Sequence, residues 1–275
     1  MKQFPIALQL YSVRDFMERD FAGTIEKVAK MGYNGVEFAG LFGKTPDEVK
    51  AICEKAGITP LSAHVPFDEM RKDPAGTAAA YATIGVKCVV VPWLGAEYQP
   101  GSEGYPVFCE TVRTMAAALA PYGITLCYHN HDFEFEKVDG KYKLDHIYDD
   151  NDASVLKVQL DTCWAEVGMG DPAAYLAKFA GRAPTVHLKD HAGEKSDRMY
   201  ALIGKDDDND ASAKESEAFE LRPVGCGKLD FPSILKTAEK VGAEWLIVEQ
   251  DQASMGKDSL GCAEMSLAYV KSIMK

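Results

Sequence analysis

The feature of this sequence that most restricts its fold is a repeated alternation of short apolar runs with longer segments of helical periodicity. The apolar runs are Ile6–Tyr11, Gly35–Phe38, Thr59–His64, Cys88–Trp93, Ile124–His129, Val155–Asp161, Thr185–Lys189 and Glu244–Glu249. Each run has the length of a strand and is too short for a typical helix. Strands that alternate with helices form a parallel sheet, and eight such units close into a barrel. The sequence therefore predicts an α/β fold, a single (β/α)₈ TIM barrel.

The segments between the runs have the periodicity of amphipathic helices. The predicted helices are Phe21–Met31, Pro46–Ala56, Ala75–Ile84, Tyr105–Pro121, Asp171–Ala180, Phe231–Val241 and Ser259–Ile273. Several of these segments end in a glycine that precedes the next run: Gly32, Gly57, Gly85, Gly123 and Gly242. Glycine readily adopts the left-handed conformation that ends a helix. Because the alternation runs from end to end, we expect residues 1–275 to form one domain.

Two stretches fit the repeat less well. Lys141–Asp150, in the fifth unit, is long enough only for a short helix or a turn. Residues 190–224 form a long connection after the seventh run, with an acidic stretch at Lys205–Asp210. This connection is expected to be either a lid over the site or a solvated excursion without a role. An open doubly wound sheet is the alternative fold, but no G-x-G-x-x-G follows the first run.

Charge and cysteine usage limit the partners of the chain. The formal net charge of −12 and the pI near 5.0 argue against nucleic acid as a partner, because phosphate backbones are repelled. No apolar run approaches the ~20 residues of a membrane-spanning helix, and the N-terminal stretch is interpreted as a strand and not as a signal peptide. The seven cysteines are scattered without a C-x-x-C pair, which favours reduced thiols and a cytoplasmic location. Homo-oligomerisation stays open.

Polar residues that a barrel core would reject occur at the ends of the apolar runs. In chain order they are Gln9, Glu37, His64, Trp93, His129, His131, Asp161, His187 and Glu249. In a parallel barrel the carboxyl ends of all strands lie on one face, so these side chains are expected to converge there. Singly, each has an ordinary explanation, such as a hydrogen-bonded structural histidine or, for Asp161, the cap of the next helix. Together, they predict a functional site.

The last four strand ends carry groups that could bind one divalent metal ion. The predicted ligands are His129, or His131 in its place, with Asp161, His187 and Glu249. Nitrogen and oxygen donors of this kind suit Mn²⁺, Zn²⁺, Co²⁺ or Fe²⁺. The two-residue period of a strand places His129 and His131 on the same inward face, so it does not decide between them.

Short motifs spread in order over the chain carry a family resemblance. They are Gln9–Arg14 (Q-L-Y-S-V-R), Gly32–Glu37 (G-Y-N-G-V-E), Ser62–His64 (S-A-H), Tyr128–Phe135 (Y-H-N-H-D-F-E-F), Leu160–Asp161, His187–Asp190 (H-L-K-D), Val224–Phe231 (V-G-C-G-K-L-D-F) and Ile247–Glu249 (I-V-E). With them the chain resembles the xylose isomerase-like TIM-barrel superfamily, often called sugar phosphate isomerases/epimerases. The Tyr-His-Asn-His version resembles a branch with inosose dehydratases and proteins that act on 3-keto sugars.

The resemblance implies a metal set of Glu, Asp, His and Glu from strands five to eight. Asp161, His187 and Glu249 match three of these positions, but His129 stands where the epimerases have a glutamate. Ketose 3-epimerases of the family are similar in using two glutamates as paired acid and base, so this chain departs from that pattern. Glu134, five residues further on, is a candidate to replace the missing glutamate.

The leading hypothesis is a metal-dependent isomerase or epimerase that removes a proton next to a carbonyl of a small-molecule sugar or cyclitol. The same enolate would serve a lyase, either a dehydratase or an enzyme of β-elimination from 3-keto sugars or glycosides. Glu37, His64 and His131 are the candidate acids and bases, and Lys189 could neutralise enolate charge or pair with Asp190. The candidate substrate contacts are Gln9, Phe67, Trp93 and Glu134.

Two other classes compete with this hypothesis. A non-catalytic sugar-binding barrel would keep aromatic residues and lose metal ligands, whereas this chain keeps its acids and histidines. An endonuclease IV-like repair enzyme would need more ligands and a basic surface, which six histidines and a charge of −12 do not supply. The turn Gly225–Gly227 (G-C-G) could hold a phosphate or simply open the next helix, and we expect an unphosphorylated substrate.

Overall fold

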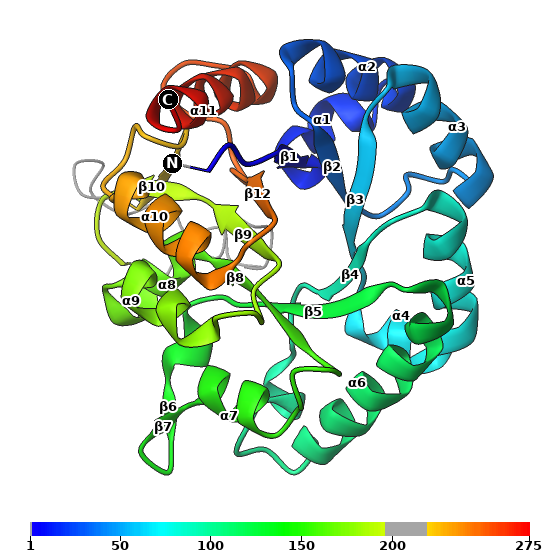
Figure 1. Ribbon diagram of the computed structural model, residues 1–275, viewed down its shortest axis with the longest axis vertical. Coiled ribbons are helices and arrows are strands. Elements are labelled where there is room, and N and C mark those ends of the chain that lie inside the picture. The colour runs from blue at the N-terminus through cyan, green and yellow to red at the C-terminus, as the bar shows by residue number, and fades with distance from the viewer. Residues whose placement is uncertain (1, 196–218) are drawn as a thin grey trace, which may run out of the picture.

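The computed structural model describes residues 2–195 and 219–275, which form a closed barrel of parallel strands surrounded by helices (Figure 1). The order of the strands around the barrel is β1-β12-β9-β8-β5-β4-β3-β2, and every neighbouring pair is parallel. The strands are β1 (Ile6–Gln9), β2 (Gly35–Ala39), β3 (Thr59–His64), β4 (Cys88–Val91), β5 (Thr125–His129), β8 (Lys157–Asp161), β9 (Thr185–Leu188) and β12 (Trp245–Val248). The predicted (β/α)₈ barrel is confirmed.

The helices lie outside the barrel and cover its strands (Figure 1). They are α1 (Arg14–Met17), α2 (Phe21–Met31), α3 (Pro46–Ala56), α4 (Phe67–Lys72), α5 (Pro74–Ile84), α6 (Tyr105–Leu119), α7 (Lys143–Asp149), α8 (Thr162–Met169), α9 (Pro172–Leu176), α10 (Phe231–Val241) and α11 (Ser259–Ile273). Short 3₁₀ turns are found at η1 (Leu10–Val13), η2 (Ala96–Tyr98), η3 (Ala120–Tyr122), η4 (Phe133–Phe135) and η5 (Ala177–Phe179). None of the helices in the described ranges is long and apolar enough to cross a membrane.

Local sequence explains where the helices begin and end. Thr45 caps α3 by accepting a hydrogen bond from the backbone N–H of Glu48, whose side chain in turn accepts from the N–H of Thr45. This reciprocal arrangement satisfies backbone donors that a helix start leaves unpaired. Gly32 and Gly57 end α2 and α3 with φ angles of +97° and +68°, which residues with a Cβ rarely adopt.

Successive side chains of a barrel strand point alternately outward, into the core under the helices, and inward, into the barrel. On β5, Leu126 and Tyr128 point outward and pack in the main apolar core beneath the helices. Cys127 points into the barrel, where it packs with Cys88 and Val90. The strand period therefore turns the next inward residue of β5, His129, into the barrel mouth.

The structure adds elements that the periodicity did not predict. The short helices α4, two residues after β3, and α8, directly after β8, have few residues and so give little periodic signal. The stretch predicted as a short helix or turn contains the strand β7 (Lys141–Tyr142), which pairs with β6 (Lys137–Val138), and then the short helix α7. Within residues 190–224, β10 (Asp190–Ala192) pairs antiparallel with β11 (Glu220–Arg222). Residues 196–218 of this connection, predicted as either a lid or a solvated excursion, lie outside the described residues.

Candidate metal centre and active site

A pocket of about 490 Å³ opens at the carboxyl ends of the barrel strands. It is lined by Tyr11, Ala39, Gly40, His64, Pro66, Glu69, Tyr81, Pro92, Trp93, His129, His131, Lys189, Glu249 and Asp251. Most of these residues come from the ends of β1, β2, β3, β4, β5, β9 and β12 or from the segments that follow directly, whereas Glu69 lies on α4 and Tyr81 on α5. Catalytic residues of TIM barrels collect on this face, so the pocket is the candidate active site.

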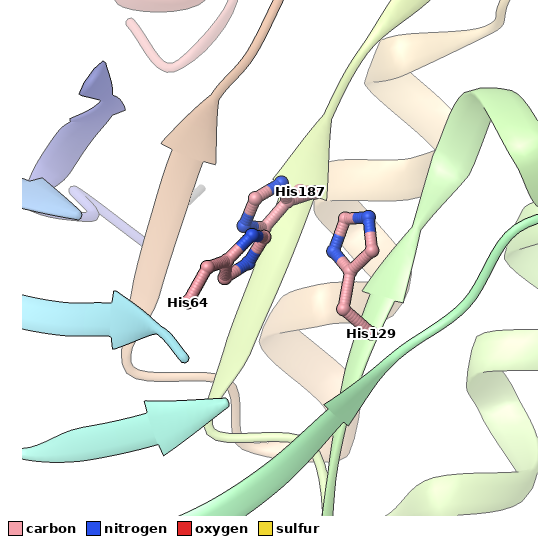
Figure 2. Close-up of side chains that lie close together, drawn as sticks. All are labelled: His64, His129 and His187. Carbon is pink, nitrogen blue, oxygen red and sulfur yellow. The ribbon is translucent and has the colours of Figure 1, made fainter. Parts of the chain in front are cut away.

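Three imidazole rings meet at the floor of the pocket. His64 ends β3, His129 ends β5, and His187 lies on β9, and Figure 2 shows their rings close together inside the strand ends. The ring of His64 stacks on that of His187 with centroids 5.4 Å apart, and His129 lies edge-on to both at 4.8 and 4.6 Å. Neutral imidazole is a common metal ligand and an efficient proton carrier near neutral pH.

Four donor groups surround one point beside these rings. His129, Asp161, His187 and Glu249 each offer an atom, and these atoms all lie within 4.8 Å of one another. His187 Nδ1 is 2.8 Å from Glu249 Oε2, and His129 Nε2 is 3.8 Å from Asp161 Oδ2. A second, overlapping group consists of His64, His129 and His187. The first group carries two carboxylates and therefore better matches the charge of a divalent cation.

Asp161 serves two purposes with its two oxygens. Its Oδ1 accepts a hydrogen bond of 2.9 Å from the backbone N–H of Trp164 and so caps α8. Its Oδ2 is buried and accepts no hydrogen bond from the described residues. A buried polar atom without a hydrogen bond is costly, and a metal ion would satisfy it. The helix-cap explanation and the ligand explanation are therefore compatible.

Glu37 lies beneath the donors as a fully buried anchor. Its Oε1 accepts hydrogen bonds from Gln9 Nε2 at 2.8 Å and from His187 Nε2 at 2.7 Å. Its Oε2 accepts from Ser62 Oγ at 2.6 Å and from Gln159 Nε2 at 2.7 Å. With both oxygens occupied, this carboxylate orients the groups above it and does not face the pocket.

This hydrogen bonding orients the ring nitrogens around the candidate metal position. His187 donates to Glu37 through Nε2 at 2.7 Å and to Glu249 through Nδ1 at 2.8 Å, and binding an ion would require Nδ1 to lose its proton. His129 Nδ1 lies 3.3 Å from the Gln159 side-chain oxygen, which leaves Nε2 on the side of Asp161. Second partners of this kind orient metal-binding histidines in proteins.

Burial and neighbouring charges shift the pKa values of the ionisable groups in the site. Burial alone would raise the pKa of Glu249, but the positive charge of Lys189 and hydrogen bonding from His187 hold it well below the usual range. Burial likewise opposes ionisation of His187, yet Glu37 and Glu249 raise its pKa to about 10. For Asp161 and Asp251 burial dominates, and the pKa of Asp251 rises to about 7 despite Lys189.

The donor set fits a divalent cation. Glu37, Asp161, Glu249 and Asp251 are four buried carboxylates, and Lys189 supplies a buried positive charge beside them. With these acids ionised and His187 neutral, as a metal ligand is, the group carries three negative charges, two of which one divalent ion would balance. The pKa of His129 is held well below its usual range by burial and by the neighbouring imidazoles, so its ring stays neutral, as a metal ligand must.

The structure brings together most of the residues predicted from sequence. His64, Trp93, His129, His131, Lys189 and Glu249 line the pocket, and Asp161 and His187 lie at its floor. Gln9 lies lower, bonded to Glu37. Phe67 packs against Tyr98 and Phe108 and does not line the pocket.

Glu134 also lies outside the pocket lining. It accepts hydrogen bonds from the Tyr128 hydroxyl at 2.6 Å and from the backbone N–H of His131 at 2.8 Å. Both bonds hold its carboxyl beneath the loop after β5, and the loop in turn places His131 against Trp93, with ring centroids 4.6 Å apart. This position favours a supporting role for Glu134.

Sequence reasoning missed Gln159 and Asp251. Gln159 bonds Glu37 and lies 2.8 Å from His64 Nε2, and Asp251 lies 2.8 Å from Lys189 Nζ. The period of β8 carried a signal for Gln159, which precedes Asp161 by two residues. Asp251 lies beyond the end of β12, where the strand period carries no signal.

Glu134 gives the fold a testable pH dependence. Burial raises the pKa of its carboxyl to about 8 from the value of 4.5 expected for the unfolded chain, although hydrogen bonds from the Tyr128 side chain and from the backbone of His131 and of Glu134 itself oppose the rise. The folded state therefore retains a proton that the unfolded chain releases, and this contribution to stability is lost as pH rises through that interval. We expect the wild-type free energy of unfolding to fall between about pH 5 and about pH 8, and Glu134→Gln to have a flatter profile in urea denaturation. Identical profiles would contradict this assignment.

A closed parallel barrel with a buried cluster of His, Asp and Glu at its strand ends defines a class of protein, the TIM barrels with a metal-site-like centre on the catalytic face. Residues 25–265 match the xylose isomerase-like TIM barrel family, and the chain belongs to that family. This confirms the resemblance found in its motifs. The family includes sugar isomerases, epimerases and dehydratases.

Individual relatives are distant but cover nearly the whole chain. An inosose dehydratase of Clostridium beijerinckii is 22% identical over 92% of this chain and 90% of that protein. One of Geobacillus kaustophilus is 22% identical over 91% and 86%. A sugar phosphate isomerase/epimerase structure from Parabacteroides distasonis has a TM-score of 0.80 at 20% identity, covering 100% of this chain and 96% of that one. Likeness at this identity shows the fold.

Proposed function

We propose that this protein is a metal-dependent enzyme that removes a proton next to the carbonyl group of a sugar or cyclitol, as an isomerase or epimerase. The observation that carries the proposal is the set of four donors around one point at the floor of an open pocket. His129, Asp161, His187 and Glu249 would hold one divalent ion, for which Mn²⁺, Zn²⁺, Co²⁺ and Fe²⁺ all suit the donors. When bound, the ion supplies a Lewis acid that stabilises negative charge on the carbonyl oxygen.

His64 is the residue best placed to take the proton. It lines the pocket, and its Nε2 lies 3.0 Å from Glu37 Oε1 and 2.8 Å from the Gln159 side-chain oxygen. With Nε2 donating to these oxygens, Nδ1 carries the lone pair that accepts a proton. A carboxylate behind an imidazole orients the ring and stabilises its protonated form, as in hydrolase triads.

His131 and Trp93 line the same pocket and contact each other. The ring of His131 lies 5.4 Å from that of His129 and 4.6 Å from that of Trp93, between centroids. His131 is thus the candidate acid that returns a proton to the substrate, and Trp93 offers an apolar face for a sugar ring. Lys189, at the pocket floor, adds a positive charge that opposes the build-up of negative charge on the substrate.

A dehydratase is the second candidate, and the residue on β5 favours it. His129 is the donor there, so the paired glutamates of a two-base epimerase are not both present. Dehydration needs one base to remove the proton and one acid to protonate the departing hydroxyl, which leaves as water. The inosose dehydratases among the relatives agree with this outcome. A non-catalytic sugar-binding barrel is the candidate from another class.

Proton exchange tests the proposal before the substrate is known. We expect the Mn²⁺-loaded protein to exchange the proton next to the carbonyl of an unphosphorylated keto sugar or inosose for deuterium in D₂O, observed by NMR. Removing the metal with EDTA should abolish exchange, and adding Mn²⁺ back should restore it.

The products separate the candidate functions. Exchange with an epimer or isomer supports the first candidate, and loss of water from the substrate supports the second. Binding of the sugar without any exchange, at full metal content, would mean that the protein is a binding barrel.

A further inference from the structure

Lys189 places a positive charge inside the candidate metal centre. Among the described residues that line the pocket, it is the only lysine or arginine. It directly follows β9 and is only 2% exposed. Its Nζ lies 2.8 Å from Asp251 Oδ2, 3.2 Å from Glu249 Oε2 and 3.5 Å from Asp161 Oδ2.

Two of these three oxygens belong to the metal donor set. Asp161 Oδ2 lies beside His129 Nε2 and Glu249 Oε2 beside His187 Nδ1, and the ammonium lies within 3.5 Å of both oxygens. Charges at this separation interact strongly in a buried site. The ammonium therefore attracts the same oxygens as a divalent cation would, and it repels the cation itself.

Asp251 draws the ammonium group of Lys189 away from Asp161 and Glu249. Of the three contacts, the one to Asp251 is the shortest, and this carboxylate is outside the donor set. The ring of Trp164 adds a second restraint, because the ammonium lies 5.4 Å from its centroid. The Lys189 side chain is thus held at the edge of the centre from two sides.

We propose that Lys189 and Asp251 form a built-in counter-charge that sets the metal affinity of this centre. Lys189 stabilises the crowded carboxylates while no metal is bound and lowers the affinity for the ion. Asp251 limits that effect by drawing the ammonium away from Asp161 and Glu249. The inference rests on the proposed function only in taking those two residues as metal ligands. Lys189 and Asp251 act here as positioning residues.

Metal binding by the purified full-length chain tests the pair. The probe is Mn²⁺, titrated by calorimetry into protein stripped with EDTA. Lys189→Met keeps the length of the side chain without its charge, and we expect it to bind Mn²⁺ more tightly by on the order of 10- to 100-fold. The metal-free variant should unfold at a lower temperature than wild type, because its carboxylates have lost their counter-charge.

Asp251→Asn is expected to have the opposite effect. With its shortest partner neutral, Lys189 interacts more fully with the ligands, so Mn²⁺ affinity should fall. The double variant should resemble Lys189→Met, since Asp251 acts through the lysine. Lys178→Met and Asp145→Asn are the matched controls, because these residues form an ion pair of 3.3 Å outside the pocket lining. Both controls should bind Mn²⁺ as wild type does.

The outcomes separate this inference from the proposed function. A folded Lys189→Met protein with unchanged or weaker Mn²⁺ affinity than wild type overturns the inference and leaves proton exchange untouched. If Lys189→Met binds Mn²⁺ and wild type does not, the result contradicts the proposed metal-dependent catalysis but supports the counter-charge role of Lys189. If neither folded protein binds the ion, both fail. Lys189→Gln gives a second uncharged side chain in case the methionine variant does not fold, as judged by circular dichroism.

Discussion

The Asp161→Asn variant is expected to lose at least about 10²- to 10³-fold in turnover, because one charged donor to the metal is removed from a buried site. Asparagine keeps the Oδ1 oxygen, so the hydrogen bond of 2.9 Å to the N–H of Trp164 and the cap of α8 should survive. The oxygen that is lost as an anion is Oδ2, which accepts no hydrogen bond from the described residues. Thermal unfolding of the metal-free variant should therefore be close to that of wild type.

Asp161→Ala is the informative companion. It removes the cap as well as the ligand and should cost about 1 kcal/mol in folding stability beyond Asp161→Asn. Glu249→Gln, which changes the partner of His187 Nδ1, should lose activity to a similar degree as Asp161→Asn. Turnover and metal content are measured on the same samples. Full turnover with full metal content in either isosteric variant would refute the ligand assignment.

His64→Ala is expected to slow exchange of the substrate proton by about 10²- to 10⁴-fold, the usual contribution of a positioned base. The effect should fall on kcat more than on KM, since His64 acts on the proton and the metal holds the carbonyl. Added imidazole should restore part of the rate by entering the space that the side chain leaves. Restoration by a small base distinguishes chemistry from mere support of the pocket.

His131→Asn serves as the comparison, because His131 lines the same pocket but lacks the contact with Glu37. We expect it to slow product formation while proton exchange into the substrate continues. If proton exchange is lost in His131→Asn and kept in His64→Ala, then His131 is the base and His64 the acid.

Much of the fold was predictable because the repeat is strong. Helices α2, α3, α10 and α11 have the bounds predicted from sequence, since their apolar stripes are long and a glycine or a charged residue marks their ends. The strands were predicted a little long at their carboxyl ends: β4 ends at Val91 and β9 at Leu188. There the chain leaves the sheet so that Trp93 and Lys189 can point into the pocket, and a polar residue after an apolar run does not reveal where hydrogen bonding to the neighbouring strand stops.

The sequence predicts which residues form the candidate site better than it predicts which of them contact each other. The sequence places His129, His187 and Glu249 at strand ends, and barrel closure brings them together without further information. It does not reveal that Glu37 faces His187 beneath the pocket, because which inward residues meet depends on the register of β2, β1, β12 and β9. For the same reason Glu37 was predicted as an acid or base, whereas its buried and fully bonded position supports a role in orienting His64 and His187.

The closure of the barrel has a consequence for how the protein is made. Its first strand pairs with its last, β12, and the donor Glu249 lies just beyond that final strand. A chain emerging from the ribosome therefore carries His129, Asp161 and His187 before Glu249 has been translated. The proposed donor set would be complete only once Glu249 has been made, so a shorter nascent chain would offer an ion three of its four donors.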